Sequence, residues 1–383
     1  MRNKNILKAL SLLAAVCITA GCNGSTMAET TTTTVAQTTT AVTREELVET
    51  EGEIVSKSND KEIAETVEIA NKTYTTDLEE LTLYIDNKTD ITELYKLNNL
   101  KHLSLCSAIP EQNIEYFEYE SIKKLTSLES LSLRFVTFKN SSKYDFDFLN
   151  SLPSLKEVEI DWDGSVSLDS LRKIEDLTKL TLYVDNSIDI SDIGALSNLK
   201  ELKIMNKSIY DYGYIENIDK ISEIEDLECL SLYLVKFNED TSLNFDFLYK
   251  MKNLRKIELG WYTLEDWSFL DNLSNIQDLT LFRCNIANID FVNEMKSLKN
   301  LTLHNTKIAD YSCLLDNYIV ETLTLLENDN LEVNYDFSGI SHLKNLKRLS
   351  INENILDENK YNRDIDLIKS SLKNCIILEG NNE

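Results

Sequence analysis

The sequence predicts an α/β solenoid, a right-handed coil with a parallel β-sheet on its concave face and short helices and loops on its convex face. Three observations support this fold class. A short apolar motif recurs twelve times along the 383 residues, and self-similarity of this kind is typical of stacked repeats. Its copies follow one another every 22 to 28 residues, a length that suits one supersecondary unit. Only two prolines and nine glycines interrupt the chain, so long stretches of it must be regular.

The recurring motif is L-x-x-L-x-L, in which isoleucine or valine often replaces a leucine. Its last two apolar positions share one face of a short strand, because side chains alternate between the faces of a strand. One copy cannot bury this face alone, whereas stacked copies form a continuous apolar ladder. Each buried leucine or isoleucine then stabilises the fold by about 1.5–3 kcal/mol. The twelve copies and a degenerate thirteenth are Leu78-Leu81-Leu83, Leu100-Leu103-Leu105, Leu128-Leu131-Leu133, Leu155-Val158-Ile160, Leu177-Leu180-Leu182, Leu199-Leu202-Ile204, Leu227-Leu230-Leu232, Leu254-Ile257-Leu259, Ile276-Leu279-Leu281, Leu298-Leu301-Leu303, Val320-Leu323-Leu325, Leu346-Leu349-Ile351 and Leu372-Cys375-Ile377.

A block of four repeats is duplicated within the chain. A shift of 99 residues superposes Phe-Asp-Phe-Leu at 146–149 on the same tetrapeptide at 245–248, and Trp162 on Trp261. The duplication concerns architecture and does not mark a site. We expect both tryptophans to wedge against adjacent coils, as large, partly buried aromatic side chains usually do.

The 22-residue copies resemble the leucine-rich repeat of the bacterial internalins, most fully at residues 279–300. That family usually places asparagine five residues after the first strand leucine, where its amide caps the turn. Here Cys284, Thr306 and Asn354 hold this position in different copies, so the asparagine ladder is imperfect. The resemblance covers residues 78–356 and implies recognition by variable side chains of the concave sheet. It does not identify a ligand, because function belongs to the site and not to the fold.

The first 21 residues read as a lipoprotein signal peptide. A basic start precedes an apolar run at 9–18, which is too short to span a bilayer as a permanent helix. The ending at 19–22, Thr-Ala-Gly-Cys, resembles a bacterial lipobox with threonine in place of the more usual leucine, and implies that Cys22 is lipidated after cleavage. The alternative is an ordinary secretory leader with an incidental cysteine.

The remaining segments divide into a tether and two caps. Residues 22–43 hold ten threonines and almost no large apolar side chain, so we expect a disordered tether. Residues 44–77 and 357–383 are predicted to cap the repeat domain at 78–356, because a solenoid needs its open ends shielded. This organisation predicts an exported protein anchored by its lipidated cysteine to the outer face of the bacterial cell membrane.

The charge of the chain excludes some classes of partner. Sixty-five acidic residues against 39 basic ones give a net charge of −26, which repels nucleic acid and anionic membrane surfaces. We therefore expect membrane contact through the lipid anchor only. The chain is also expected to be a monomer.

Candidate ligand-binding residues follow the second strand leucine of each copy. This position points away from the core, and aromatic side chains there are typical of binding hot spots. The alternative is that the same side chains pair across neighbouring strands and stabilise the sheet without a ligand. The candidates are Tyr84, Arg134, Tyr183, Met205, Tyr233, Phe282 and His304.

The sequence predicts a binding protein and not an enzyme. It holds only three histidines, on different repeats, and no nucleophile elbow, phosphate-binding loop or metalloprotease motif, so we expect no cofactor and no metal. The predicted function is protein–protein interaction, as an adhesin or as the partner of another envelope protein. A carbohydrate-binding surface, in which tyrosines and tryptophans stack on sugars, is the alternative.

Overall fold

The computed structural model describes most of the repeat region and the strands that precede it, and residues 65–383 form one compact unit. The predicted leader, Cys22, the tether at 22–43, residues 44–64 of the predicted N-terminal cap, and Asn354 lie outside the described residues. The described residues are 65–108, 119–134, 146–164, 166–184, 187–207, 214–233, 236–237, 244–264, 266–286, 288–306, 308, 310–326, 336–351 and 366–379.

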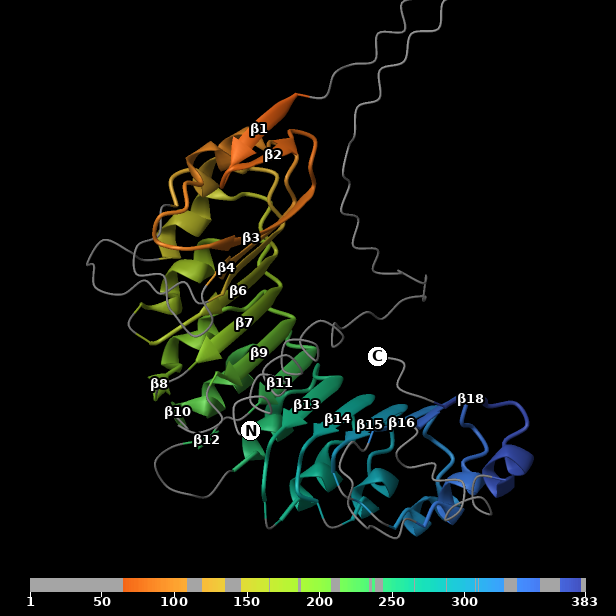
Figure 1. The fold of residues 1–383 in the computed structure, drawn as a ribbon. Helices are drawn as coiled ribbons and strands as arrows, with labels where there is room; N and C mark the ends of the chain where they lie inside the picture. Colours follow the sequence, from red (N-terminus) through yellow and green to blue (C-terminus); the bar gives the residue numbers. More distant parts are fainter. Residues whose placement is uncertain are drawn as a thin grey trace, which may run out of the picture. The chain divides into compact units, whose positions relative to one another are not determined.

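A 13-stranded parallel sheet organises this unit, with its strands paired in chain order (Figure 1). Each of the twelve complete motifs supplies one strand, so the predicted leucine-rich-repeat solenoid is confirmed. The strands are β3 (Glu80–Ile85), β4 (His102–Ser107), β5 (Ser130–Arg134), β6 (Glu157–Asp161), β7 (Lys179–Val184), β9 (Glu201–Asn206), β11 (Cys229–Tyr233), β13 (Lys256–Gly260), β14 (Asp278–Phe282), β15 (Asn300–His304), β16 (Thr322–Leu326), β17 (Arg348–Ile351) and β18 (Ile376–Glu379).

The register of the sheet follows the leucines. Leu81 pairs with Leu103, and Leu279 pairs with Leu301, so the motif positions form continuous rows that face the core. The degenerate last copy is the exception, because Ile377, and not Cys375, pairs with Leu349. This shift of two residues keeps the same face of β18 toward the core, since strand side chains alternate with period two.

Two smaller sheets accompany the main one. β1 (Thr66–Ile69) and β2 (Lys72–Thr75) form an antiparallel hairpin just before the first repeat strand. β8 (Ile188–Asp189), β10 (Tyr214–Glu216) and β12 (Lys236–Phe237) form a short parallel sheet in the order β12-β10-β8.

Short 3-10 helices close the coils on the side opposite the main sheet (Figure 1). They match the short helices expected for the convex side. Residues 366–371 are α-helical. The 3-10 helices are η1 (Thr92–Lys96), η2 (Ile122–Lys124), η3 (Phe146–Ser151), η4 (Leu168–Lys173), η5 (Ser191–Ala195), η6 (Ile218–Glu223), η7 (Asp246–Lys250), η8 (Ser268–Asn272), η9 (Asp290–Asn293), η10 (Ser312–Asp316) and η11 (Ser338–His342).

The core lies between the sheet and the 3-10 helices and runs through the whole unit. It is one continuous cluster from Val67 to Leu372, and central strand leucines such as Leu230 and Leu232 are fully buried. Replacing one such leucine by alanine typically costs about 2–5 kcal/mol, so each coil depends on its two neighbours.

Acidic side chains begin many of the 3-10 helices. The carboxylate of Asp266 accepts the backbone N–H of Ser268 at 2.8 Å, and Asp189, Asp310 and Asp336 do the same two residues before their own helix. These bonds satisfy backbone donors that a short helix leaves unpaired, so part of the large acidic content has a structural role.

Removing one of these capping side chains is expected to reduce the free energy of unfolding only modestly. Asp266→Ala should lower the free energy of unfolding slightly, because the N–H of Ser268 loses its acceptor, and urea denaturation measures the change. Hydrogen bonds to Ser268 hold the pKa of Asp266 below its usual value, so this stabilisation is present at neutral pH and lost as the pH falls through that lowered pKa. Asp271→Ala, in the same helix, is the control. An equal loss in both variants would contradict a specific role for the cap.

Candidate functional site

The sheet presents one face to the core and an opposite, open face. On the open face the residues after the second strand leucine lie side by side in one row, which we call the distal row. The candidate ligand-binding residues are therefore brought onto one surface, with Tyr84 at its N-terminal edge. The row is Tyr84, Cys106, Arg134, Asp161, Tyr183, Met205, Tyr233, Gly260, Phe282, His304 and Leu326.

The expected exposure of this row is wrong for four of the candidates. Tyr183, Met205, Tyr233 and Phe282 are only 2–4% exposed, whereas Tyr84 is 71% exposed. Arg134 and His304 are half-buried. Neighbouring strands lie about 4.8 Å apart, so large side chains in one row cover one another. Their role in binding a ligand remains a prediction.

Arg134 and Tyr183 make the first set of contacts in the row. The guanidinium carbon of Arg134 lies 3.4 Å from the centre of the Tyr183 ring, a cation–π contact. Its Nε is 3.4 Å from Asp161, and the ammonium of Lys207 is 3.2 Å from the same carboxylate. The buried charge of Asp161 is thus balanced by two cations, as a buried carboxylate requires.

Tyr233 makes the second set of contacts. Its ring lies across Gly260, where a Cβ atom would approach the ring to 2.1 Å, so the missing side chain makes room for the tyrosine. The Tyr233 hydroxyl donates to Glu258 at 3.0 Å, and Ser231 donates to the same carboxylate at 2.9 Å. Lys256 pairs with Glu258 at 2.7 Å. This packing supports the alternative interpretation, in which the aromatic side chains of the row stabilise the sheet without a ligand.

Phe282 connects Tyr233 to His304. The Phe282 ring centre is 6.4 Å from that of Tyr233 and 4.6 Å from that of His304. Burial and the neighbouring charge of Arg283 lower the pKa of His304 to about 4. The imidazole is therefore uncharged at neutral pH.

A feature that the sequence did not reveal lies directly beyond the distal row. Trp261, Arg283 and Asn305 follow the ends of β13, β14 and β15, and all three have left-handed backbone, with φ of 66°, 50° and 53°. We call them the left-handed row. This conformation costs a residue with a Cβ about 1–2 kcal/mol, and such strain is concentrated at functional sites. Glycine would have been the usual signal for it.

The two duplicated tryptophans occupy different environments. Trp162 is buried in the core and donates its indole N–H to the carbonyl of Val166 at 2.8 Å. Trp261 is half-buried and contacts Phe282 at 5.7 Å between ring centres, while Tyr262 occupies the core instead. Trp261 therefore packs against the next coil, as expected, whereas the wedging of Trp162 against an adjacent coil stays a prediction.

Arg283 stacks on Trp261. Its guanidinium carbon lies 4.5 Å from the centre of the indole ring. Within the described part of the chain no acid pairs with this arginine, and neither Arg283 Nε nor Trp261 Nε1 has a hydrogen-bond acceptor. Two buried donors without acceptors thus lie beside the distal row.

Arg283→Gly is expected to change the free energy of unfolding by less than about 1 kcal/mol. Relief of about 1–2 kcal/mol of left-handed strain offsets the greater chain entropy of glycine, about 0.5–1 kcal/mol, and a lost cation–π contact of similar size. Urea denaturation measures the change, with Asn305→Gly as the matched control. A loss above about 3 kcal/mol would show that Arg283 is retained for stability.

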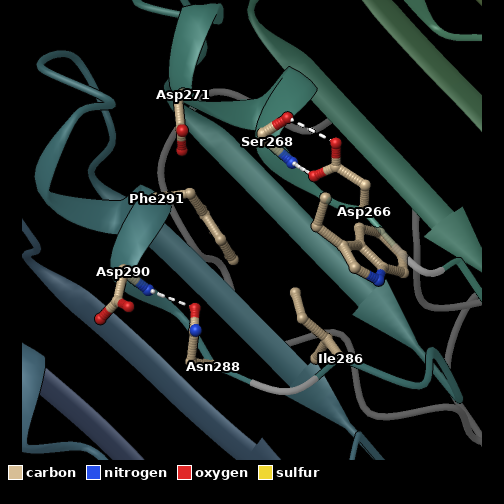
Figure 2. A pocket seen from close by; sticks show the side chains of 8 residues that line it. Asp266, Ser268, Asp271, Ile286, Asn288, Asp290 and Phe291 are labelled. Carbon is tan, nitrogen blue, oxygen red and sulfur yellow. Dashed lines mark hydrogen bonds between the residues drawn. The ribbon is translucent and has the colours of Figure 1, made fainter.

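A pocket of about 310 Å³ lies on the opposite side of the coils, between η8 and η9 (Figure 2). Ile286, Phe291, Asp266, Asp271 and Asp290 are among the residues that line it (Figure 2). Asp266 and Asn288 are engaged in capping backbone N–H groups of the two helices. Two of the polar side chains that line the pocket therefore have a structural role in the repeats.

The described residues contain no group of three histidine, cysteine or acidic side chains that could hold a metal ion. Burial raises the pKa of the Cys284 thiol to about 12 and that of Cys313 to about 11, so neither is a thiolate at neutral pH. The Cys284 thiol donates instead to the carbonyl of Leu259 at 3.3 Å, where the internalin-type repeat would carry an asparagine amide.

In the same part of the chain, none of the helices combines the length and the hydropathy that crossing a bilayer requires.

Comparison with known proteins finds similar folds among solved structures. No family model matches the chain, and no curated protein matches it. An internalin (InlF) of Listeria monocytogenes is 18% identical, with a TM-score of 0.46, and the match covers 82% of this chain and 91% of that one. Internalin C2 of the same species is 22% identical, with a TM-score of 0.37, over 55% and 85% of the two chains. A leucine-rich-repeat protein of Leptospira interrogans is 18% identical, with a TM-score of 0.39, over 79% and 90%.

The class of the protein rests on its own repeats and sheet. Twelve in-register motifs on thirteen parallel strands define a leucine-rich-repeat solenoid. The matched structures have TM-scores below 0.5, so they add no argument about what this chain binds.

Proposed function

We propose that the chain is a lipid-anchored cell-surface protein that binds a protein or peptide ligand through the open face of its sheet. Adhesion and binding of an envelope partner are the two roles that this function covers. The leader, the lipobox at Cys22 and the threonine-rich tether support surface anchoring. We further propose that the chain acts as a monomer.

One observation carries the proposed binding role. Besides the buried rings, the open face offers a continuous polar row on adjacent strands, two residues before the distal row. Hydroxyl groups dominate it, and most of them are half-buried or exposed. Such groups suit hydrogen bonding to a peptide backbone. The hydroxyl-bearing members are Thr82, Ser104, Ser132, Thr181, Ser231, Thr280, Thr302, Thr324 and Ser350.

The proposal is tested by obstructing the open face. Residues 44–383, which contain the whole compact unit, serve as bait against cell-envelope and host-surface extracts. A variant carrying Ser132→Arg and Thr302→Arg places a bulky cation in each half of the sheet. Tyr318→Arg, at a 51% exposed position that follows η10, is the matched control.

A partner retained by the wild type and by Tyr318→Arg, and lost by the double variant, is the expected result. Equal capture by all three proteins would move the interaction away from the open face. Truncating Tyr183, Tyr233 or Phe282 is a poor test, because these side chains are buried and their loss would destabilise the sheet.

The carbohydrate alternative is less well supported. It requires aromatic rings that face solvent, and Tyr183, Tyr233 and Trp162 are 2–4% exposed. Tyr84 on β3 and Trp261 just after β13 are more exposed, but they lie at distant positions in the sheet. Sugars usually stack on exposed rings, so these two separated side chains favour a protein ligand.

A further inference from the structure

We propose that Arg283, held on Trp261 beside His304, binds a carboxylate of an acidic segment in the protein ligand. This inference rests on the proposed function and adds the chemistry of one contact. Trp261, Phe282, Arg283 and His304 are called the carboxylate site below.

The backbone indicates that the position of Arg283 is functional. Three successive coils hold non-glycine residues in left-handed conformation at the same repeat position. The residue that follows each of them is buried in the core: Tyr262, Cys284 and Thr306. The core therefore requires only the residue after each left-handed one, and it does not require tryptophan or arginine before it.

The stacking orients the guanidinium. The guanidinium carbon lies 4.5 Å from the centre of the Trp261 ring, and Nε of Arg283 is buried, so a carboxylate would pair with the terminal N–H groups. A planar guanidinium pairs with a carboxylate through two parallel hydrogen bonds, which are stronger and more directional than neutral ones. Stacking also limits the rotamers of Arg283, so less side-chain entropy is lost on binding.

Among the described residues, Arg283 lacks a negatively charged partner. The chain has 65 acidic residues, yet Arg283 forms no ion pair with any acid among the residues described. His304 carries no charge at neutral pH, because its pKa is about 4. The charge that the site presents is therefore the single positive charge of Arg283, in a partly buried setting where an ion pair is worth more than at an open surface.

The surroundings favour a peptide as the bearer of the carboxylate. Thr280, Thr302 and Thr324 lie in register on β14, β15 and β16, immediately beside Phe282 and His304. Their hydroxyl groups can donate to and accept from the amides of an extended chain. The net charge of the protein opposes the approach of an acidic peptide, but at about 0.15 M ionic strength this repulsion is screened beyond about 8 Å.

The test follows the side-chain N–H signals of residues 44–383 by 15N NMR at about 0.15 M ionic strength. Hexaglutamate is the probe, and hexaglutamine is the matched neutral peptide. Three indole signals are expected, and Trp261→Phe assigns one of them. The indole N–H groups of Trp162 and Trp267 donate to the carbonyls of Val166 and Asn285, so they serve as internal references.

Hexaglutamate should shift the signals of Trp261 Nε1–H and Arg283 Nε–H in a saturable manner and leave the two reference indoles unmoved. Hexaglutamine should shift neither. Arg283→Gln should abolish the response of Trp261, and Arg283→Lys, which keeps the charge without the planar fork, should weaken it.

Three results would overturn the inference: no shift, an equal shift with hexaglutamine, or a shift that survives Arg283→Gln. A shift with oligogalacturonate and none with hexaglutamate would assign the site to carboxylated glycans instead. Failure here is distinguishable from failure of the proposed function. A captured partner that is lost by the open-face variant and retained by Arg283→Gln would leave the function standing without this contact.

Discussion

Gly339→Ala is expected to lower the free energy of unfolding by about 3 kcal/mol, near the upper end of what overpacking usually costs. A Cβ atom at this position would lie 1.9 Å from the carbonyl oxygen of Tyr311 and 2.7 Å from its carbonyl carbon. Both are backbone atoms of the neighbouring coil, so no change of rotamer can relieve the contact. Either η11 moves away from η10 or the coils separate.

The packing around Gly339 leaves little room for such a movement. The Tyr311 and Phe337 rings pack 5.5 Å apart, and Tyr311 donates its N–H to the carbonyl of Asp336 at 3.1 Å. Urea denaturation of residues 44–383 measures the effect. Ser338→Ala, one residue earlier in the same 3-10 helix, adds no atom and should change stability by less than about 0.5 kcal/mol. A loss below about 1 kcal/mol for Gly339→Ala would show that the two coils separate at little cost.

Glu258→Ala is expected to cost about 3 kcal/mol, because removing one partner of a buried ion pair leaves the other uncompensated. Glu258 is 1% exposed and accepts from Ser231 and Tyr233 while pairing with Lys256. Its loss leaves two hydroxyl groups and one ammonium without their acceptor on the open face. The variant is again compared with the wild type by urea denaturation.

Two further variants separate charge from hydrogen bonding at this position. Glu258→Gln keeps an acceptor for the two hydroxyl groups and should lose less than Glu258→Ala. Ser231→Ala removes a single hydrogen bond and should cost about 1 kcal/mol. A Glu258→Ala protein as stable as the wild type would mean that solvent reaches Lys256 and Tyr233 freely.

The fold could be predicted from the sequence because the motif that specifies each strand recurs along the chain. A strand with alternating leucines is ambiguous alone, but the same motif at a regular spacing fixes both the strands and their order. The one error of register, at Ile377, occurs in the copy whose motif is degenerate, with cysteine where a leucine would stand. Periodicity determines which face of that strand is apolar, and it does not determine which pair of residues meets the neighbouring strand.

The sequence predicts where the candidate residues lie in the sheet, but it does not predict how exposed their side chains are. The pattern places Tyr183 and Tyr233 on the open face, but it does not indicate that Arg134 covers one ring or that Gly260 admits the other. The sequence does not indicate the left-handed row, because its residues are tryptophan, arginine and asparagine and not glycine. In the first copy of the duplication Asp163 follows Trp162, so the tryptophan enters the core. In the second copy Tyr262 is available for the core, and Trp261 remains at the open face.

The spacing of the parallel strands has a consequence for any ligand that lies across them. The sheet offers a new side chain of each row about every 4.8 Å, whereas an extended peptide directs side chains to one side about every 6.7 Å. The two periods do not match, so a peptide with a repeating sequence cannot meet every coil in the same way. The side chains of such a peptide can lie directly opposite those of one coil, but a few strands away they no longer lie opposite the side chains of the sheet. A mismatch of this kind favours ligands that make one strong local contact, and it penalises ligands that depend on many equal ones.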